Sequence, residues 1–234
     1  MLFVHEVHTV VGRKEDEFEA AFRDYWMPTM AKTDYARLLW YTNHAHGSGL
    51  SYNVVTVTAV RDGRAWEDIA RRVQRGDLQP WMRELDTLRH DVVGKVLVPL
   101  YWSPVQEIDL DAIPADGRRH DLTLYMEDTM WPYAGKLQDY IDASGSVYAK
   151  SLGAGRSEPF ITIELALQAA FATHVRGEVM LMQKIHDLDR LQWLLTSDMP
   201  PEIRGPGTWM HEALAVRDQW ESKLLRTSAW SPLY

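Results

Sequence analysis

Residues 80–105 read PWMRELDTLRHDVVGKVLVPLYWSPV, and residues 208–233 read TWMHEALAVRDQWESKLLRTSAWSPL. Aligned without a gap, 128 positions apart, the two stretches share the pairs Trp81/Trp209, Met82/Met210, Glu84/Glu212, Arg89/Arg217, Lys95/Lys223, Trp102/Trp230, Ser103/Ser231 and Pro104/Pro232. Two tryptophan pairs at one fixed offset are hard to obtain by chance, because tryptophan is rare. The stretches therefore predict a tandem duplication in which each of them closes one repeat.

The first half of the chain alternates strand and helix patterns. Strands are expected over residues 2–11, 36–46, 51–61 and 92–101, and the middle two are joined by the turn-forming Gly47-Ser48-Gly49. Helical periodicity follows the first strand and returns between the third and the fourth. The resulting order, β-α-β-β-α-β, is that of a ferredoxin-like unit.

The same order is expected again in the second half. Strand patterns span residues 121–130, 159–171 and 177–185. An apolar stripe then predicts a long helix that runs into a short last strand near 224–230. The stripe consists of Trp209, Ala213, Val216, Trp220 and Leu224.

These patterns predict a first repeat over residues 1–105, a linker over 106–119 and a second repeat over 120–234. A ferredoxin-like unit covers only one face of its sheet with helices, so the other face must be buried against something. Two units in one chain can bury their open faces on each other. The expected fold class is therefore α+β, with tandem ferredoxin-like repeats that form a pseudo-dimeric α+β barrel.

The composition excludes several classes of protein. The 234 residues carry 25 basic and 33 acidic side chains, a net charge of −8, and no basic cluster that would suit nucleic acid or anionic lipid. The absence of cysteine excludes disulfides, thiolate metal sites and a cysteine nucleophile. No apolar run approaches the length of a membrane span. We expect a cytoplasmic protein.

Four short motifs point to a known family. They are Val4-His5-Glu6-Val7-His8 in the first strand, Leu50–Val55, Pro132–Leu137, and the Trp-Ser-Pro endings at 102–104 and 230–232. With these motifs the chain resembles the NIPSNAP-like members of the dimeric α+β barrel superfamily. That superfamily also holds antibiotic-biosynthesis monooxygenases, chlorite-dismutase-like proteins and polyketide cyclases.

The resemblance implies a pocket between sheet and helices that acts on an apolar aromatic or polyketide-like metabolite. The implied chemistry is oxygenation, cyclisation or isomerisation by proton transfer, with no cofactor. The chain also departs from the family pattern, because His8 stands where the first strand usually has arginine and the second repeat has Glu127-Asp128-Thr129. A binding role of that arginine does not carry over.

Histidine exchanges protons near neutral pH, so His5 and His44 are the expected catalytic bases. His5 shares a strand face with Phe3 and Val7 and should be buried with them. A lone histidine on an apolar face is, however, more often a core residue. His44 and His46 lie two apart on an expected strand and form the alternative, a divalent-metal pair that needs a third ligand. A solvated strand end beside a glycine-rich turn explains that pair equally well.

Polar residues near strand centres or starts are expected to contact a substrate. They are Tyr41, Asn53, Tyr125 and Glu164. Glu164 interrupts an apolar strand, so its carboxyl group lies either on an open sheet face or in a pocket. Arg89 and Arg217 match across the repeats, and we expect them to be structural, each paired with a matching glutamate.

Two other classes of function stay open. The first is a haem protein of the same fold, for which His174 or His186 would supply the proximal ligand. The second is a non-catalytic NIPSNAP-type binding or assembly protein. The expected partners are a small-molecule substrate and further copies of the chain, in a homodimer or higher homo-oligomer.

Overall fold

The computed structural model describes residues 1–153, 159–175 and 177–234, which form two compact units. The first unit contains Met1–Val98, Gln106–Thr123 and Leu224–Tyr234, and the second contains Pro99–Val105 and Leu124–Lys223. The predicted linker therefore lies inside the first unit. The predicted repeats differ from these units at their ends, because each Trp-Ser-Pro ending belongs to the unit built mainly by the other half of the chain.

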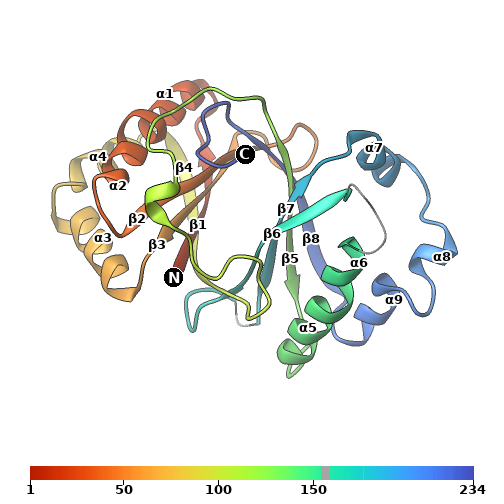
Figure 1. The fold of residues 1–234 in the computed structure, drawn as a ribbon. Coiled ribbons are helices and arrows are strands. Elements are labelled where there is room, and N and C mark those ends of the chain that lie inside the picture. Colours follow the sequence, from red (N-terminus) through yellow and green to blue (C-terminus); the bar gives the residue numbers. More distant parts are fainter. Residues whose placement is uncertain (154–158, 176) are drawn as a thin grey trace. The chain divides into compact units, whose positions relative to one another are not determined.

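The first unit is an antiparallel sheet with helices on one face (Figure 1). Its strand order is β4-β1-β3-β2, and the last residues of β8 continue the sheet beside β2. The strands are β1 Leu2–Val10, β2 Ala36–His44, β3 Asn53–Val60 and β4 Arg89–Pro99. The helices are α1 Glu15–Ala20, α2 Met27–Ala31, α3 Gly63–Arg75 and α4 Gln79–Leu85, with a π-helical stretch, Ala21–Trp26, joining α1 to α2.

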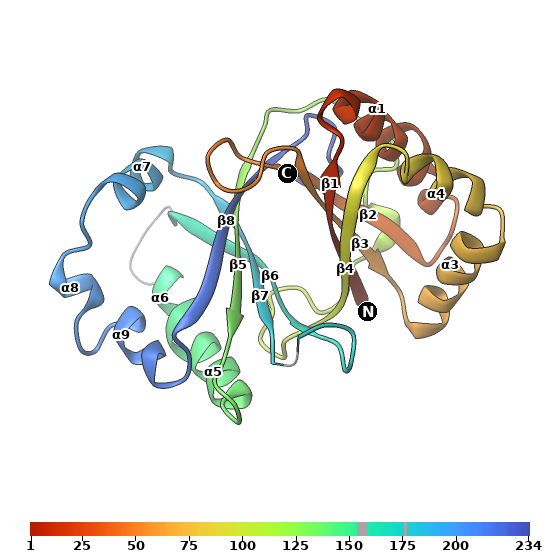
Figure 2. The ribbon, with the colours of Figure 1, turned by 180° about the vertical axis from the view of Figure 1, so that it is seen from behind.

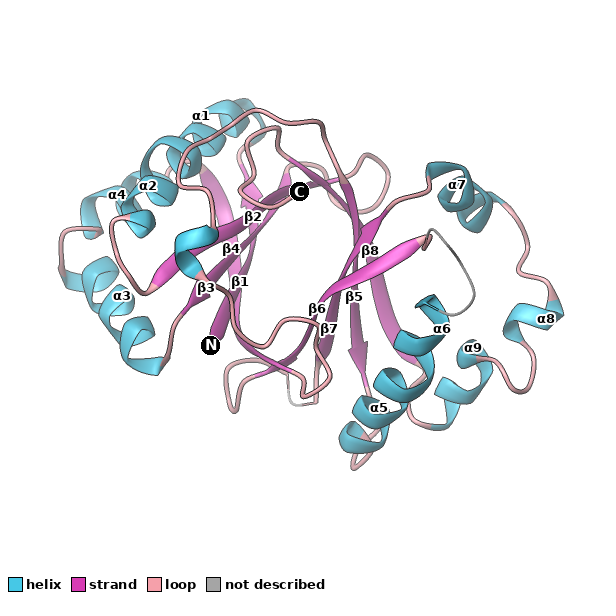
Figure 3. Cartoon of the chain, viewed as in Figure 1, coloured by secondary structure: helices cyan, strands magenta, loops and turns pink. Residues whose placement is uncertain are grey.

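The second unit repeats this layering (Figure 2). Its strand order is β8-β5-β7-β6, and its helices lie on one side of the strands. The strands are β5 Leu124–Trp131, β6 Ile161–Ala169, β7 Val179–Ile185 and β8 Gln219–Thr227. The helices are α5 Leu137–Ala143, α6 Ala149–Gly153, α7 Leu188–Thr196, α8 Pro201–Arg204 and α9 Trp209–Glu212. The separation of helices from strands (Figure 3) confirms the predicted α+β class.

The last strand is longer than the sequence pattern predicted. The helix expected to run from Trp209 to Leu224 ends in a 3-10 turn at Ala213–Ala215, and β8 begins at Gln219. The prediction was wrong because it treated Trp220 as a core residue. Trp220 is 43% exposed, and its ring lies 4.4 Å from the guanidinium carbon of Arg217.

A bulge in β2 decides which side chains face the helices. The register against β3 shifts between Leu38 and Trp40, and a bulge of this kind reverses the alternation of faces. Leu38 and Tyr41 therefore both belong to the helix-side core. β6 has the same irregularity between Ile163 and Leu165, with Glu164 as the extra residue.

The two Trp-Ser-Pro endings make matched contacts at these bulges. Ser231 Oγ accepts the backbone N–H of Tyr41 at 3.1 Å, and Ser103 Oγ accepts that of Ala166 at 3.0 Å. The indole N–H of Trp230 donates to Glu19, and that of Trp102 donates to the carbonyl of Ile141. Each ending thus fastens a bulged strand and the first helix of its unit. The duplication itself stays a prediction.

We predict that Ser231→Ala destabilises the protein. The substitution leaves the buried N–H of Tyr41 without its acceptor, and a lost partner of this kind costs about 1–3 kcal/mol. Urea unfolding measures the change. Ser146→Ala is the control, because the exposed Ser146 hydroxyl donates to the carbonyl of Asp142, one helical turn earlier, and leaves no buried group without a partner. Its effect should stay within about 0.5 kcal/mol. Equal unfolding midpoints for the two variants would contradict the role given to Ser231.

Candidate functional site

A cavity of about 230 Å³ lies between the sheet and the helices of the first unit. Side chains from β1 and β3 form its floor, and side chains from the π-helical stretch, α3 and α4 form its walls. The lining is mainly apolar and aromatic, and includes Phe22, Trp26, Trp66, Ile69, Val73 and Trp81. Its volume is just below the roughly 300–1,000 Å³ of drug-sized ligand pockets. A ligand of one to three fused rings suits it.

Trp81 forms the aromatic wall of this apolar cavity. Its ring stacks on Trp26 at 4.9 Å and 12°, and on Tyr25 at 5.6 Å and 16°. The indole N–H of Trp26 donates to Thr58 Oγ1 at 3.4 Å. The indole N–H of Trp81 is buried and has no hydrogen-bond partner among the described residues. A buried donor without a partner is costly, and a ligand oxygen would remove that cost.

Glu6 brings a carboxyl group into the apolar cavity. It lies in the middle of β1, between Thr56 of β3 and Gly94 of β4, and it lines the cavity together with Arg89. Burial raises the pKa of the Glu6 carboxyl, and the charge of Arg89 opposes that rise. A carboxyl group whose pKa is raised toward neutrality is a better proton acceptor than an ordinary glutamate.

Arg89 is held in place by three partners. Its side chain is 6% exposed and donates to Asp86 Oδ1, to Met82 Sδ at 3.2 Å and to His8 Nδ1 at 2.9 Å. Arginine can only donate, so His8 Nδ1 is an acceptor and the proton of His8 sits on Nε2, which donates to Thr56 Oγ1 at 3.1 Å. Burial and the charge of Arg89 hold the pKa of His8 well below its usual range. His8 is therefore neutral and positions Arg89.

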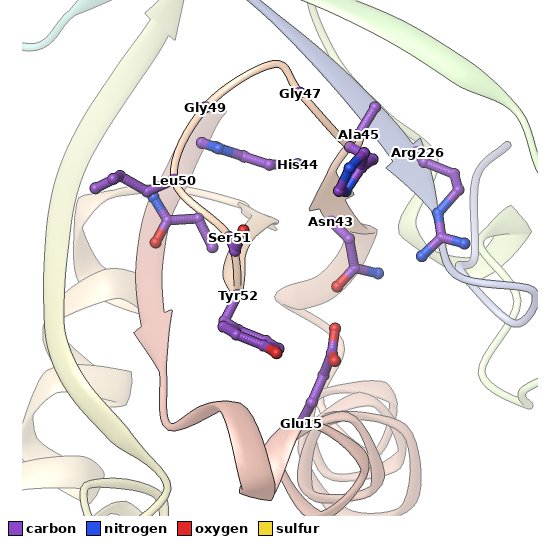
Figure 4. Close-up of a pocket in the computed structure, with 12 residues that line it drawn as sticks. Glu15, Asn43, His44, Ala45, Gly47, Gly49, Leu50, Ser51, Tyr52 and Arg226 are labelled. Carbon is purple, nitrogen blue, oxygen red and sulfur yellow. The ribbon is translucent and has the colours of Figure 1, made fainter.

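A second cavity, of about 430 Å³, lies at the open end of β2 and β3 (Figure 4). Most of the residues that line it are polar, and we call it the polar cavity. Three predicted residues meet here: His44, His46 and Asn53. The ring of His44 lies over Gly49, where a Cβ atom would come within 2.7 Å of Nδ1. β2 ends at His44, so His46 lies in the loop and strand alternation does not align the two imidazoles.

The other predicted residues lie outside both cavities. His5 is buried as expected, but on the face of β1 opposite to Glu6. Tyr41 belongs to the helix-side core, where burial and the nearby Glu19 raise the pKa of its hydroxyl. In the second unit, Tyr125 is buried on β5 and Glu164 is the bulge residue of β6. The structure therefore does not gather the predicted residues into one site.

The described residues contain no group of three or more His, Cys, Asp or Glu side chains that could hold a metal ion. The histidines considered for haem lie at exposed positions. His174 is within 3.5 Å of Glu178, and His186 bonds Thr162 Oγ1 at 2.9 Å. Within the described part of the chain, no helix has the length and apolar character to cross a bilayer.

No protein-family model and no curated protein matches the sequence. Solved structures do match the fold over nearly the whole chain. A candidate monooxygenase from Lactobacillus acidophilus NCFM has a TM-score of 0.58 at 9% identity, covering 99% of this chain and 97% of its own. One from Fusobacterium nucleatum has 0.61 at 8% identity, covering 97% and 91%. An anthrone oxidase-like protein has 0.59 at 13% identity, with the same coverage.

NIPSNAP proteins match as well, over a smaller part of the chain. A NIPSNAP domain protein from Burkholderia xenovorans has a TM-score of 0.37 at 21% identity and covers 45% of this chain and all of its own. The chain therefore has the ferredoxin-like fold of the monooxygenase-type proteins, as the resemblance predicted.

Two features of the apolar cavity were not predicted from the sequence: the place of Glu6 in its lining and the partners of Arg89. Glu6 was read as part of a family motif, although its place on the same strand face as Val4 and His8 could have marked it as a helix-side carboxyl group. Arg89 was expected to pair with a glutamate. It pairs instead with Asp86, one turn earlier, and with His8.

We predict that Glu6→Gln stabilises the protein at pH 7. A carboxyl group with a raised pKa binds its proton more tightly in the folded state, so its contribution to stability is present at low pH and is lost as pH rises. The gain in urea midpoint should therefore be largest at neutral pH and shrink toward the ordinary pKa of 4.5. Glu67→Gln, at an exposed position of α3, is the control and should show no such trend. Parallel pH profiles for both variants would contradict the raised pKa.

Proposed function

We propose that the first unit is an enzyme that takes a proton from a small apolar aromatic substrate and lets the resulting anion react with dioxygen. The observation that carries the proposal is a carboxyl group of raised pKa beside a buried guanidinium in an aromatic cavity. A base and a fixed positive charge in an apolar site are the two elements that proton abstraction needs.

Glu6 is the base in this proposal. Its carboxylate takes a proton from an acidic O–H or C–H group of the substrate, and the charge of Arg89 stabilises the anion that forms. The N–H of Trp81 donates to the substrate oxygen. The stacked rings of Trp26 and Trp81 hold the flat substrate and exclude water.

Dioxygen is the second substrate and the oxidant. For a substrate with an activated CH₂ group, the carbanion gives its electrons to dioxygen and forms the C–O bond of a hydroperoxide. Loss of water then leaves a carbonyl group, so that CH₂ and O₂ become C=O and H₂O. No electron carrier is required. The likeness in fold to candidate monooxygenases and to an anthrone oxidase-like protein supports this class of reaction.

Neither His8 nor His5 acts as the base in this proposal. His8 cannot accept a proton without losing its bond to Arg89, and His5 lies on the opposite face of β1. Cyclisation or isomerisation would begin with the same proton transfer but would consume no dioxygen. Oxygen uptake therefore separates the two kinds of reaction.

We predict that the purified protein consumes dioxygen with anthrone-type substrates and that Glu6→Gln lowers kcat by at least about 100-fold, because general-base catalysis contributes roughly 10²–10⁴. An oxygen electrode and product chromatography measure this. Glu67→Gln should keep full activity. Because the pKa of Glu6 is raised, kcat/KM of the wild type should rise with pH through a value above 4.5. Full activity of Glu6→Gln would overturn the assignment, and turnover without oxygen uptake would favour isomerisation.

We predict that Trp81→Phe lowers kcat/KM about tenfold, because it removes one buried hydrogen bond to the substrate and keeps an aromatic ring in the stack. The control is Trp66→Phe, at a half-exposed wall position whose indole takes part in no stack with Trp26 or Trp81. Equal losses in the two variants would show that ring area matters and the N–H does not.

A further inference from the structure

The polar cavity has opposite charges on different walls. Glu15, the first residue of α1, and Arg226, on β8, line it, and Figure 4 shows the carboxylate and the guanidinium directed into the same space. Neither side chain makes a hydrogen bond or an ion pair with any residue in the described ranges. Each charge is therefore available to a ligand.

Glu19, one turn further along α1, differs from Glu15 because its carboxylate is fully hydrogen-bonded within the protein. Its two oxygens accept from Ser228 Oγ at 3.1 Å and from Trp230 Nε1 at 2.6 Å. Arg226 lies in β8, and Ser228 comes two residues later, just after the end of that strand. Glu19 of α1 is thus bonded by the segment that follows β8, whereas Glu15 and Arg226 make no bond to each other.

Two buried amides line the polar cavity together with these charges. Asn43 lies opposite Arg226 in the β2–β8 ladder, and Asn53 opens β3. Each is 8% exposed, and both line the polar cavity. Asn53 Oδ1 is buried and has no partner in the described part of the chain. Buried amide oxygens are nearly always bonded, so this oxygen is an acceptor that the donor of a ligand can satisfy.

The loop that closes this cavity is held in an unusual conformation. Tyr52 has a φ of +62°, which is rare for a residue with a side chain. Its ring packs over Gly12, where a Cβ atom would come within 2.9 Å of the ring. Backbone strain of this kind concentrates at ligand sites. In Figure 4 the Tyr52 hydroxyl lies on the same side as Glu15.

We propose that the polar cavity binds a small zwitterion of the amino-acid class. Its ammonium group lies at Glu15, its carboxylate lies at Arg226, and a hydrogen-bond donor of the ligand meets Asn53 Oδ1. Arg226 suits a carboxylate because its planar fork donates two parallel hydrogen bonds. The volume of about 430 Å³ admits an amino acid with a sizeable side chain and leaves room for bridging water. This site shares no lining residue with the apolar cavity, so it is independent of the proposed reaction.

Isothermal titration calorimetry with the intact protein tests this. The probes are the free proteinogenic amino acids, β-alanine and γ-aminobutyrate, followed by the deaminated acid and the decarboxylated amine of the tightest binder. We expect the zwitterion to bind at least about tenfold more tightly than either singly charged analogue, because each charged hydrogen bond is worth about one to two powers of ten.

Two matched pairs of variants assign the charges. Glu15→Gln should weaken binding of the zwitterion about 10- to 100-fold but not binding of the deaminated acid, which has no ammonium group. Arg226→Gln should weaken binding of the zwitterion by a similar factor but not binding of the decarboxylated amine, which has no carboxylate. Glu67→Gln and Arg75→Gln, on the exposed side of α3, should leave binding unchanged. Circular dichroism confirms that each variant is folded.

Three results would overturn the zwitterion site. One is that no probe binds with Kd below about 1 mM. Another is that a singly charged analogue binds as tightly as the zwitterion, which would leave a simple anion or cation site. The last is that Glu15→Gln and Arg226→Gln are both silent. None of these bears on oxygen uptake at the apolar cavity, so each proposal stands or falls on its own.

Discussion

The buried guanidinium of Arg89 organises the first unit. A charge at this depth is tolerated only if its donors are satisfied, and here Asp86, His8 and Met82 accept from it. That requirement fixes the tautomer of His8 and, through Nε2, the position of Thr56 on the neighbouring strand. It also places a positive charge beside Glu6 on the same cavity wall. The electrostatics of the apolar cavity therefore follow from how one arginine is buried.

The second unit has Arg217 at the position that matches Arg89, but the polar groups near it form a different network. Asp128 on β5 accepts from Gln183 at 2.8 Å, and Gln183 in turn accepts from the Tyr148 hydroxyl at 2.6 Å. Burial raises the pKa of both Asp128 and Tyr148. Trp209, which matches Trp81, stacks on Tyr148 at 5.5 Å. Asp128, Gln183 and Tyr148 thus bond one another, although Arg217 Nε and Nη1 are buried with no hydrogen-bond partner among the described residues. In the first unit a carboxyl group of raised pKa lines an aromatic cavity. The first unit is therefore the better place for proton transfer, because its carboxyl group lines a cavity that a substrate can fill.

Most of the fold was predictable because the strands have clear local signals in the sequence. Alternation, β-branched residues and glycine turns placed β1, β2 and β3 within about three residues of their bounds, the usual uncertainty for such limits. β8 was misplaced because its residues also fit a helical stripe, and only pairing with β5 decides between the two. The exchanged Trp-Ser-Pro endings could not be foreseen. Their serine contacts at the bulges join residues more than sixty positions apart, Ser103 with Ala166 and Ser231 with Tyr41.

The candidate sites were harder to predict, and the bulge in β2 shows why. Strict alternation from Leu38 would put Trp40 and Thr42 on the helix side and send Tyr41 and Asn43 to the opposite face. The extra residue between Leu38 and Trp40 reverses this, so Tyr41 enters the helix-side core and Asn43 turns toward α1 and the polar cavity. A bulge leaves no reliable mark in a single sequence. β1 has no irregularity before Thr9, so the same alternation correctly separates His5 from Glu6. It follows that alternation along β1 could have identified Glu6 as a cavity residue, whereas no reading of β2 alone could have done so for Asn43.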